Sequence, residues 1–375
     1  MRVLVAQIPM PQNRFLVDLN GEIAKHCTIR HSSDEFWNME GDFDVIQLHF
    51  PEHLTYEIEK FYFSGIKDGT AHGLTDDMIA LTAKRLEYWS SRAKLVVTRH
   101  NLLPHDALED PMWDKMYELF YSHADGVAHF AQASIDEFRV RYKDTCWVSG
   151  KPPQHVIIPN QNYTTLPNEV SQKDARRRLG ISQSASVLLV FGAIRNGDTE
   201  KKLIIDTFDN LNVPRKLLLV SSWRETLREI SWIRLKYWIR DLTRLYYRLH
   251  PGYHFNYGFV EEEDTQLYLN AADVLFIPRL WVLNSGNVTL GMTFGKVVVG
   301  PDAWDVGELL RETGNPVFDP DRPKTAAAAV EEGFRLAAEG ERGPANRDLA
   351  LREWGAGQCA ALYVALYRRV LDKGF

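Results

Sequence analysis

Short apolar runs alternate with longer amphipathic segments along the chain, and the alternation occurs twice. In the first half, strands are predicted at RVLVAQI, DVIQLHF, KLVVTRH, DGVAHF and HVIIP, and an amphipathic helix is predicted at TDDMIALTAKRLEYWSS. In the second half, strands are predicted at SVLLVFG, RKLLLVSS, DVLFIP and GKVVVGP. Strands that alternate with helices are typical of parallel sheets covered by helices. The pattern therefore predicts two doubly wound α/β domains.

Turn-forming residues separate the two halves. The segment PNQNYTTLPNEVSQKDARRRLGI combines Pro and Asn with a short basic helix, which predicts a linker near residues 160–172. The end of the chain, LREWGAGQCAALYVALYRRVLDK, predicts a last amphipathic helix. We expect an N-terminal Rossmann-like domain over residues 1–165, a second one over 166–350, and a C-terminal helix over 351–375.

Composition and charge narrow the class of protein. The chain has 375 residues, of which 45% are hydrophobic and 25% charged, and this length favours two globular domains. A formal net charge of -6 argues against a general nucleic-acid binder, whose affinity depends on many basic contacts. The three cysteines lie far apart and predict neither a disulfide framework nor a metal site. No run approaches the roughly 20 apolar residues of a membrane span, and no signal sequence is recognisable, so we expect a cytoplasmic protein.

A turn of small polar residues lies between the last two predicted strands. Asn284, Ser285, Gly286 and Asn287 precede an apolar segment that is expected to be helical. Backbone N–H groups and the positive end of a helix dipole at such a turn can bind an anion. The turn therefore predicts a phosphate site.

A second group of candidate phosphate ligands follows the first strand of the second half. Gly192 permits close approach of the backbone to a ligand, and Arg195 with Lys201 could clamp a diphosphate. An ordinary strand, turn and helix with solvated charges is the alternative interpretation. The first strand of the chain, by contrast, precedes PMPQNRF and lacks Gly-x-Gly-x-x-Gly, which disfavours a nicotinamide or flavin cofactor.

Four segments together resemble bacterial glycosyltransferases of the GT-B fold, relatives of the family-4 group that builds surface polysaccharides. They are FDVIQLHFPE (43–52), VVTRHNLLPHD (96–106), FGAIRNGDTEKKLIIDTF (191–208) and LNSGNVTLGMTFGKVVVGPD (283–302). The resemblance implies two Rossmann-like domains that face a central cleft and a C-terminal helix that packs back on the N-terminal domain. It also implies an enzyme that transfers a hexose from a UDP- or GDP-sugar to a saccharide or lipid-linked saccharide in polysaccharide or glycan biosynthesis.

The resemblance also assigns roles to single residues. Arg195 and Lys201 match the pair that neutralises the donor diphosphate, and the segment 285–287 matches the turn whose amides reach the phosphates. Gly192 and Asn284 complete the implied donor site in the C-terminal domain. His100 matches a histidine that faces the donor sugar from the acceptor side.

The sequence departs from the family pattern at two positions. Retaining members of the group usually carry Glu-x7-Glu, but here the two positions are Val282 and Leu290. Leu290 cannot accept a hydrogen bond from a ribose hydroxyl. The sequence therefore leaves both stereochemical outcomes open.

An inverting reaction would require a general base to take the proton of the acceptor hydroxyl. The acceptor-side candidates in the first domain are Glu52, His100 and Asp106, to which Asp18 is added. His100 has the best position because it follows a predicted strand. Asp106 could instead cap a helix that begins near residue 107, and Asp18 is expected on a solvated helix face.

One motif suggests another class of enzyme. HFPEH (49–53) matches the His-x-x-Glu-His pattern of some zinc peptidases. That chemistry requires both histidines on one helical turn, whereas His49 ends a predicted strand and Pro51 lies between the ligands. We therefore expect a metal-independent protein without a cofactor, with the nucleotide-sugar as substrate.

The segment from Trp223 to His250 has an unusual composition. It contains seven Lys or Arg and three acidic residues, interleaved with Trp and Tyr. Such a segment could contact an anionic membrane as a peripheral anchor, where a lipid-linked acceptor would be presented. The composition favours the alternative, an amphipathic helix that covers the sheet with its Trp and Leu while its Arg side chains snorkel to water.

Two further functions are compatible with these residues. A nucleotide-sugar 2-epimerase would share the fold and release nucleotide without an acceptor. A non-catalytic nucleotide- or carbohydrate-binding protein would explain the apolar residues at 282 and 290.

Overall fold

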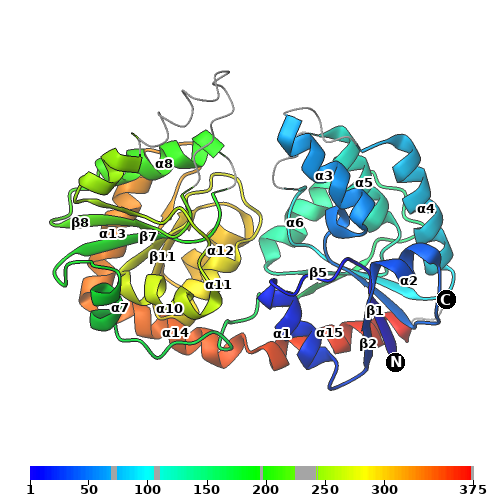
Figure 1. Cartoon of the computed structure of the whole chain (residues 1–375). Helices are drawn as coiled ribbons and strands as arrows, with labels where there is room; N and C mark the ends of the chain where they lie inside the picture. The colour runs from blue at the N-terminus through cyan, green and yellow to red at the C-terminus, as the bar shows by residue number, and fades with distance from the viewer. Residues whose placement is uncertain (69–73, 105–109, 195–196, 224–241, 243, 373–375) are drawn as a thin grey trace. The chain divides into compact units, whose positions relative to one another are not determined.

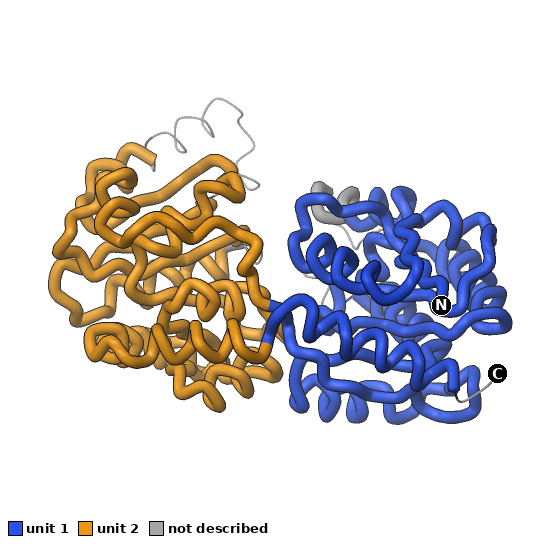
Figure 2. The backbone as a smooth tube through the Cα atoms, turned by 90° about the horizontal axis from the view of Figure 1, so that it is seen from below, with its two compact units in different colours: residues 1–161, 354–375 blue, residues 162–353 orange. Residues whose placement is uncertain are grey.

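The structure is a computed structural model that describes residues 1–68, 74–104, 110–194, 197–223, 242 and 244–372. The chain folds into two compact units (Figure 2). Unit 1 comprises residues 1–161 together with the segment from Trp354 onward, and unit 2 comprises residues 162–353. The C-terminal segment therefore returns to the N-terminal unit.

Within the described residues, unit 1 contains a six-stranded sheet with the order β2-β1-β3-β4-β5-β6, in which all neighbouring strands are parallel. Its strands are β1 (Arg2–Val5), β2 (Thr28–His31), β3 (Val45–Leu48), β4 (Lys94–Thr98), β5 (Gly126–His129) and β6 (Gln154–Ile157). Every position of β3, β4 and β5 is buried, as expected for a parallel sheet covered on both faces.

Helices cover both faces of this sheet (Figure 1). They are α1 (Arg14–Ile23), α2 (Ser33–Asn38), the 3-10 turn η1 (Pro51–His53), α3 (Tyr56–Asp68), α4 (Asp76–Ser90), α5 (Pro111–Ser122), α6 (Gln132–Arg141) and α15 (Ala356–Leu371). Thr75 caps α4 by accepting a hydrogen bond from the Met78 N–H, which explains why the predicted helix begins there. Because side chains alternate along a strand, Leu4 and Ile46 face α4 and α5, whereas Val3 faces α1 and α15.

The last helix is part of the core of unit 1. Leu366 and Val370 of α15 cover Gly126 of β5, where a Cβ atom would lie 3.1 Å and 3.2 Å from them. The hydroxyl groups of Tyr363 and Thr98 are 2.9 Å apart and form a buried hydrogen bond. The expectation that the C-terminal helix packs back on the N-terminal part of the chain is confirmed.

Unit 2 contains, among its described residues, a second six-stranded parallel sheet with the order β12-β11-β10-β7-β8-β9. Its strands are β7 (Ser186–Val190), β8 (Lys216–Val220), β9 (Tyr253–Phe255), β10 (Val274–Phe276), β11 (Val297–Pro301) and β12 (Val317–Phe318). Its helices include α7 (Gln172–Arg178), α8 (Gly197–Asp209), α10 (Glu262–Ala271), α11 (Gly286–Thr293), α12 (Trp304–Glu312), α13 (Thr325–Glu339) and α14 (Arg342–Glu353), and residues 244–249 are also helical. The prediction of two doubly wound parallel sheets is confirmed.

The strand order of each unit reverses at one point. In unit 1, the chain passes from β1 to β2 and then returns to β3 on the other side of β1. In unit 2, it passes from β7 through β8 and β9 and returns to β10 on the other side of β7. Ligands of open α/β sheets bind outside the carboxyl ends of the strands at such reversal points. The loops after β1 and β3, and those after β7 and β10, are therefore the places to search.

None of the described helices combines the length and the apolar composition that crossing a bilayer requires.

The packing of α15 predicts different effects for the same substitution at two positions. Leu366→Ala should lower the free energy of unfolding of unit 1 by about 2 to 5 kcal/mol, because it opens a cavity beside Gly126. Leu362→Ala, on the solvent side of the same helix, should change it by less than about 0.5 kcal/mol. Urea denaturation monitored by circular dichroism measures both values. Equal effects would contradict the packing of α15 on β5.

Candidate functional site

The reversal point of unit 2 brings two loops into contact. Gly192 follows β7 with a φ of +85°, a conformation that L side chains rarely adopt, and its N–H donates to Ser221 Oγ at 2.8 Å. From the other loop, Asn287 Nδ2 donates to the carbonyl oxygen of Phe191 at 2.7 Å. The structure thus places Gly192 and Asn287, both candidates from the sequence, next to each other.

The first turn of α11 has the features of an anion site. Ser285 is its N-cap residue with extended backbone, and no side chain among the described residues caps the helix there. The amide groups of the first turn therefore lack a side-chain acceptor, and the helix dipole adds partial positive charge. Asn284, Gly286 and Asn287 are half-buried at this turn. The arrangement can accept an anionic group between the β7 loop and α11.

Of the two predicted cationic ligands, Lys201 and Arg195, one lies among the described residues. Lys201 of α8 is half-buried, with Nζ 5.8 Å from the ring centroid of Trp223. Arg195, the other predicted diphosphate ligand, lies outside the described residues. Lys201 is therefore placed on the helix that follows the β7 loop.

The sequence interpretation missed Arg279, which follows β10. Its Nε lies 3.5 Å from the Glu200 carboxylate, and its Nη2 donates to the carbonyl of Ala193 at 3.4 Å. Arg279 therefore holds the β7 loop from the β10 side of the reversal point. Its position directly after the strand DVLFIP was the signal that could have identified it.

The two positions that match Glu-x7-Glu are core positions here. Val282 and Leu290 are both buried, so neither offers a polar group to a ligand. Beside them, the aromatic rings of Trp281 and Trp304 meet with centroids 5.6 Å apart. Trp304 has a φ of +39°, which is unusual for a residue other than Gly and is typical of functional sites. The sequence interpretation did not include these two tryptophans.

The reversal point of unit 1 contains a histidine pair. His49 follows β3 and His100 follows β4, and His49 Nδ1 lies 3.0 Å from His100 Nε2. The His100 ring stacks on Phe50 at 4.1 Å and meets the edge of Phe15 at 5.2 Å. Burial lowers the pKa of His100 to about 3 and lowers the pKa of His49 well below its usual value. Both imidazoles are therefore neutral at pH 7, and such a weak base is better suited to hydrogen bonding than to proton acceptance.

Polar atoms around this pair have unused hydrogen-bonding capacity. Gln7 follows β1 and is fully buried, and neither side-chain amide atom has a hydrogen-bond partner within the described part of the chain. The same holds for Nε2 of His49 and of His31, at the end of β2. Buried polar atoms without partners are rare in proteins and suggest a ligand or water. Gln7 and His31 were not predicted, although both stand at the ends of strands.

The remaining candidates of unit 1 have other partners. Glu52 is buried in η1 and accepts a hydrogen bond from the Tyr117 hydroxyl at 2.8 Å. Asp18 accepts a hydrogen bond from Arg14 Nη2 at 2.9 Å, and its side chain is largely buried. The expectation of a solvated position for Asp18 is therefore wrong, because the ion pair with Arg14 holds the carboxylate along α1. Asp106 lies outside the described residues.

The two histidines of HFPEH have different partners. His49 pairs with His100, whereas His53 Nδ1 lies 2.9 Å from the Glu59 carboxylate. Because η1 is a 3-10 turn of three residues, the motif does not form the helical turn of a zinc peptidase. Nor do the described residues contain a group of three or more His, Cys, Asp or Glu that could hold a metal ion.

Solved structures of similar fold extend over the whole chain. The sucrose-phosphate synthase of Thermosynechococcus elongatus matches with a TM-score of 0.66 and 16% identity, over 100% of this chain and 99% of that one. HepE of Anabaena, in complex with UDP-glucose, matches with a TM-score of 0.63 and 14% identity, over 100% of this chain and 99% of that one. A glycosyltransferase from Rickettsia africae matches with a TM-score of 0.59 and 11% identity, again over 100% of this chain and 99% of that one. No family model and no curated protein matches the sequence.

These likenesses and the two parallel sheets define the fold. The chain has the GT-B glycosyltransferase fold: two Rossmann-like units, with a C-terminal helix that returns to the first. The resemblance drawn from the four sequence segments is thus confirmed for the fold.

The contact between the two loops of unit 2 predicts the effect of removing one side chain. Asn287→Ala should weaken the binding of a nucleoside diphosphate about tenfold, because the β7 loop loses a hydrogen bond that holds it beside α11. Asn210→Ala also removes a bond from an Asn side chain to a backbone carbonyl, but at an exposed helix end, and should leave binding unchanged. Isothermal titration calorimetry compares the two. Unchanged affinity in Asn287→Ala would remove this contact from the ligand site.

The histidine pair predicts how stability depends on pH. The pKa of His100 is lower in the folded state than in the unfolded state. The contribution of His100 to the free energy of unfolding is therefore fully present above about pH 6.5 and is lost progressively as the pH falls toward 3. Between about pH 7 and pH 5, His100→Gln should lose about 2 kcal/mol less of its free energy of unfolding than the wild type does. Exposed His26→Gln is the control and should keep the wild-type dependence. Urea denaturation at both pH values measures this, and parallel curves for all three proteins would contradict the prediction.

Proposed function

We propose that the protein is a nucleotide-sugar-dependent glycosyltransferase that moves a sugar from a UDP- or GDP-sugar to a lipid-linked saccharide in polysaccharide or glycan biosynthesis. The observation that carries the proposal is the first turn of α11, which has no side-chain cap among the described residues and is joined to the β7 loop by Asn287. An anion site at the reversal point of a Rossmann-like sheet suits the diphosphate of such a donor. That the similar HepE structure is a complex with UDP-glucose supports this choice of ligand.

The proposed chemistry requires stabilisation of the leaving group. Departure of the nucleoside diphosphate develops negative charge on its phosphate oxygens, and fixed positive groups lower that barrier. The amides of the 285–287 turn would supply fixed dipoles, and Lys201 and Arg195 would supply charge. Arg279 would act as a positioning residue, because its contacts hold the β7 loop.

The proposed acceptor site is the polar group at the reversal point of unit 1. Gln7, His31 and His49 offer unused hydrogen-bonding atoms, which suits the hydroxyl groups of a sugar. The neutral pair of His49 and His100 can orient such hydroxyls without bringing a buried charge. Glu52 would support this region from η1 through its bond to Tyr117.

A non-catalytic nucleotide-binding protein is the second candidate function. The observation that favours it is the burial of Val282 and Leu290, which removes both acidic positions of the family pattern from any ligand. Such a protein would bind the same nucleotide but would leave the donor sugar in place.

A panel of nucleoside diphosphates tests the proposed donor site. UDP or GDP at about 100 times its dissociation constant should raise the free energy of unfolding by about 2.7 kcal/mol, measured as a rise in melting temperature. Arg195→Ala should abolish most of the stabilisation by the diphosphate and should leave binding of the nucleoside nearly unchanged, because only a phosphate contact is lost. Equal losses for the diphosphate and the nucleoside would show that Arg195 is structural.

Incubation with the stabilising nucleotide's sugar conjugates separates the functions. Release of nucleoside diphosphate that depends on an added lipid-linked saccharide supports the transferase. Release of free nucleotide and an epimerised sugar without any acceptor would identify the epimerase. Binding without any release would leave the non-catalytic function.

A further inference from the structure

The helical segment that precedes β9 exposes a row of apolar side chains. Leu242, Leu245, Tyr246 and Leu249 are all largely exposed, with Leu249 73% accessible. The spacing i, i+3, i+4 and i+7 places them on one face of a helix. Soluble proteins rarely expose contiguous apolar side chains unless the surface contacts a partner.

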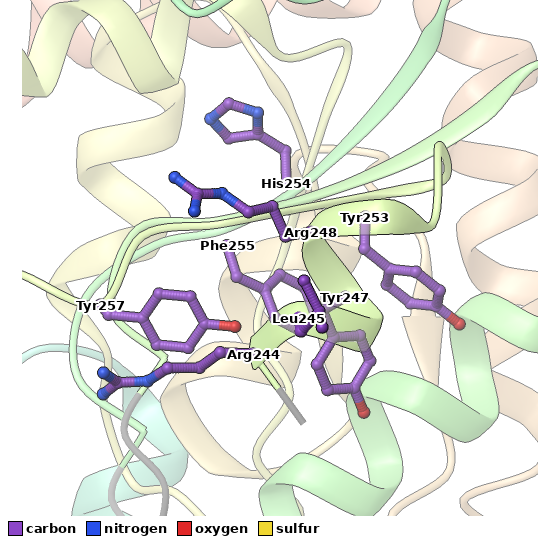
Figure 3. Close-up of a pocket in the computed structure, with 8 residues that line it drawn as sticks. All are labelled: Arg244, Leu245, Tyr247, Arg248, Tyr253, His254, Phe255 and Tyr257. Carbon is purple, nitrogen blue, oxygen red and sulfur yellow. The ribbon is translucent and has the colours of Figure 1, made fainter. Parts of the chain in front are cut away.

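The opposite face of this segment is packed on unit 2. Tyr247 meets the rings of Phe255 and Tyr253 at centroid distances of 4.6 Å and 5.1 Å, and the Arg244 guanidinium lies over the Tyr257 ring at 4.6 Å. Figure 3 shows these side chains between the helix and the edge strand β9. The exposed row therefore belongs to an anchored element. Residues 224–241, on which most of the expected covering helix would fall, lie outside the described residues, whereas Leu242, Leu245 and Leu249 in the described part are exposed.

A cationic cavity adjoins the apolar row. It has a volume of about 520 Å³ and is lined by Arg244, Arg248 and His254 together with aromatic rings (Figure 3). Leu245 belongs both to the cavity lining and to the exposed row. An anionic group at the rim of this cavity would therefore lie beside an apolar surface.

Charge selects the partner. The described residues 242 and 244–250 include Arg244 and Arg248 and no acidic residue, although the whole chain has a net charge of -6. Apolar side chains beside Arg and Tyr suit the boundary between the headgroups and the acyl chains of an anionic bilayer. Pairing with a second copy would place the basic segments together.

We propose that Leu242, Leu245, Tyr246 and Leu249 dock on the surface of an anionic phospholipid bilayer, with Arg248 beside the phosphate headgroups. The helix lies parallel to the membrane plane, and its apolar row enters the outer acyl region. This surface is separate from the donor site at α11, and its function does not depend on transferase activity. It would bring the protein to the membrane where a lipid-linked acceptor is located.

Flotation of the full chain with vesicles tests the docking surface without any nucleotide. The protein should bind vesicles of phosphatidylcholine with phosphatidylglycerol, and not vesicles of phosphatidylcholine alone. Leu249→Ser should lower the partition coefficient about tenfold, because it removes an apolar side chain from the bilayer. Arg248→Glu should lower it by about fivefold or more, and added salt should reduce that difference.

Val140→Ser is the matched control, since Val140 on α6 is 72% exposed, as much as Leu249, and lies in unit 1. It should bind vesicles as the wild type does. Wild-type binding by Leu249→Ser, equal binding to both vesicle types, or a dimer that Leu249→Ser converts to monomer without any change in flotation would overturn the proposal. Retained melting temperatures and diphosphate-induced thermal shifts in these variants separate a failure of docking from a failure of the proposed donor site.

Discussion

The hydrogen bond from Asn287 to the carbonyl of Phe191 joins the two loops on which the candidate donor site depends. The strands β7 and β10 are neighbours in the sheet, but the chain between them forms β8 and β9, so pairing in the sheet brings together two loops that are distant in sequence. Gly192 suits the β7 loop because its φ of +85° is a backbone conformation that L side chains rarely adopt. Arg279 holds the same loop through Ala193, so the position of the β7 loop is fixed from two sides.

The sequence pattern predicted the interior strands and the edge strand β6, and missed the edge strands β2, β9 and β12. Interior strands such as β4 and β11 are buried at every position, and their continuous apolar runs are easy to recognise. The strands β2, β9 and β12 lie at sheet edges, where partial exposure permits mixed residues or where only two residues pair. Their strand character comes from pairing with a neighbour, and a single sequence does not contain that information.

Local turn chemistry explains which site residues the sequence identified. Gly192 and the turn 284–287 were recognised because backbone conformation and helix capping leave a signature within a few positions. Gln7, Arg279 and the Trp281–Trp304 pair were missed because their importance arises from groups distant along the chain. Conversely, Glu52 resembled a reactive carboxylate in the sequence, but Tyr117 holds it in a buried hydrogen bond.

The kind of polar group present bears on the proposed reaction. Burial lowers the pKa of His100 to about 3, so this imidazole is poorly suited to take a proton at pH 7. Glu52 accepts a hydrogen bond from the Tyr117 hydroxyl, and Asp18 accepts one from Arg14. The apolar side chains at 282 and 290 remove two further carboxylates from the family pattern. What the described site offers instead is N–H groups at the first turn of α11. Under the proposed function, such a site lowers the barrier chiefly by stabilising the departing diphosphate, because stabilisation of a leaving group requires donors and positive charge, whereas activation of an acceptor requires a base.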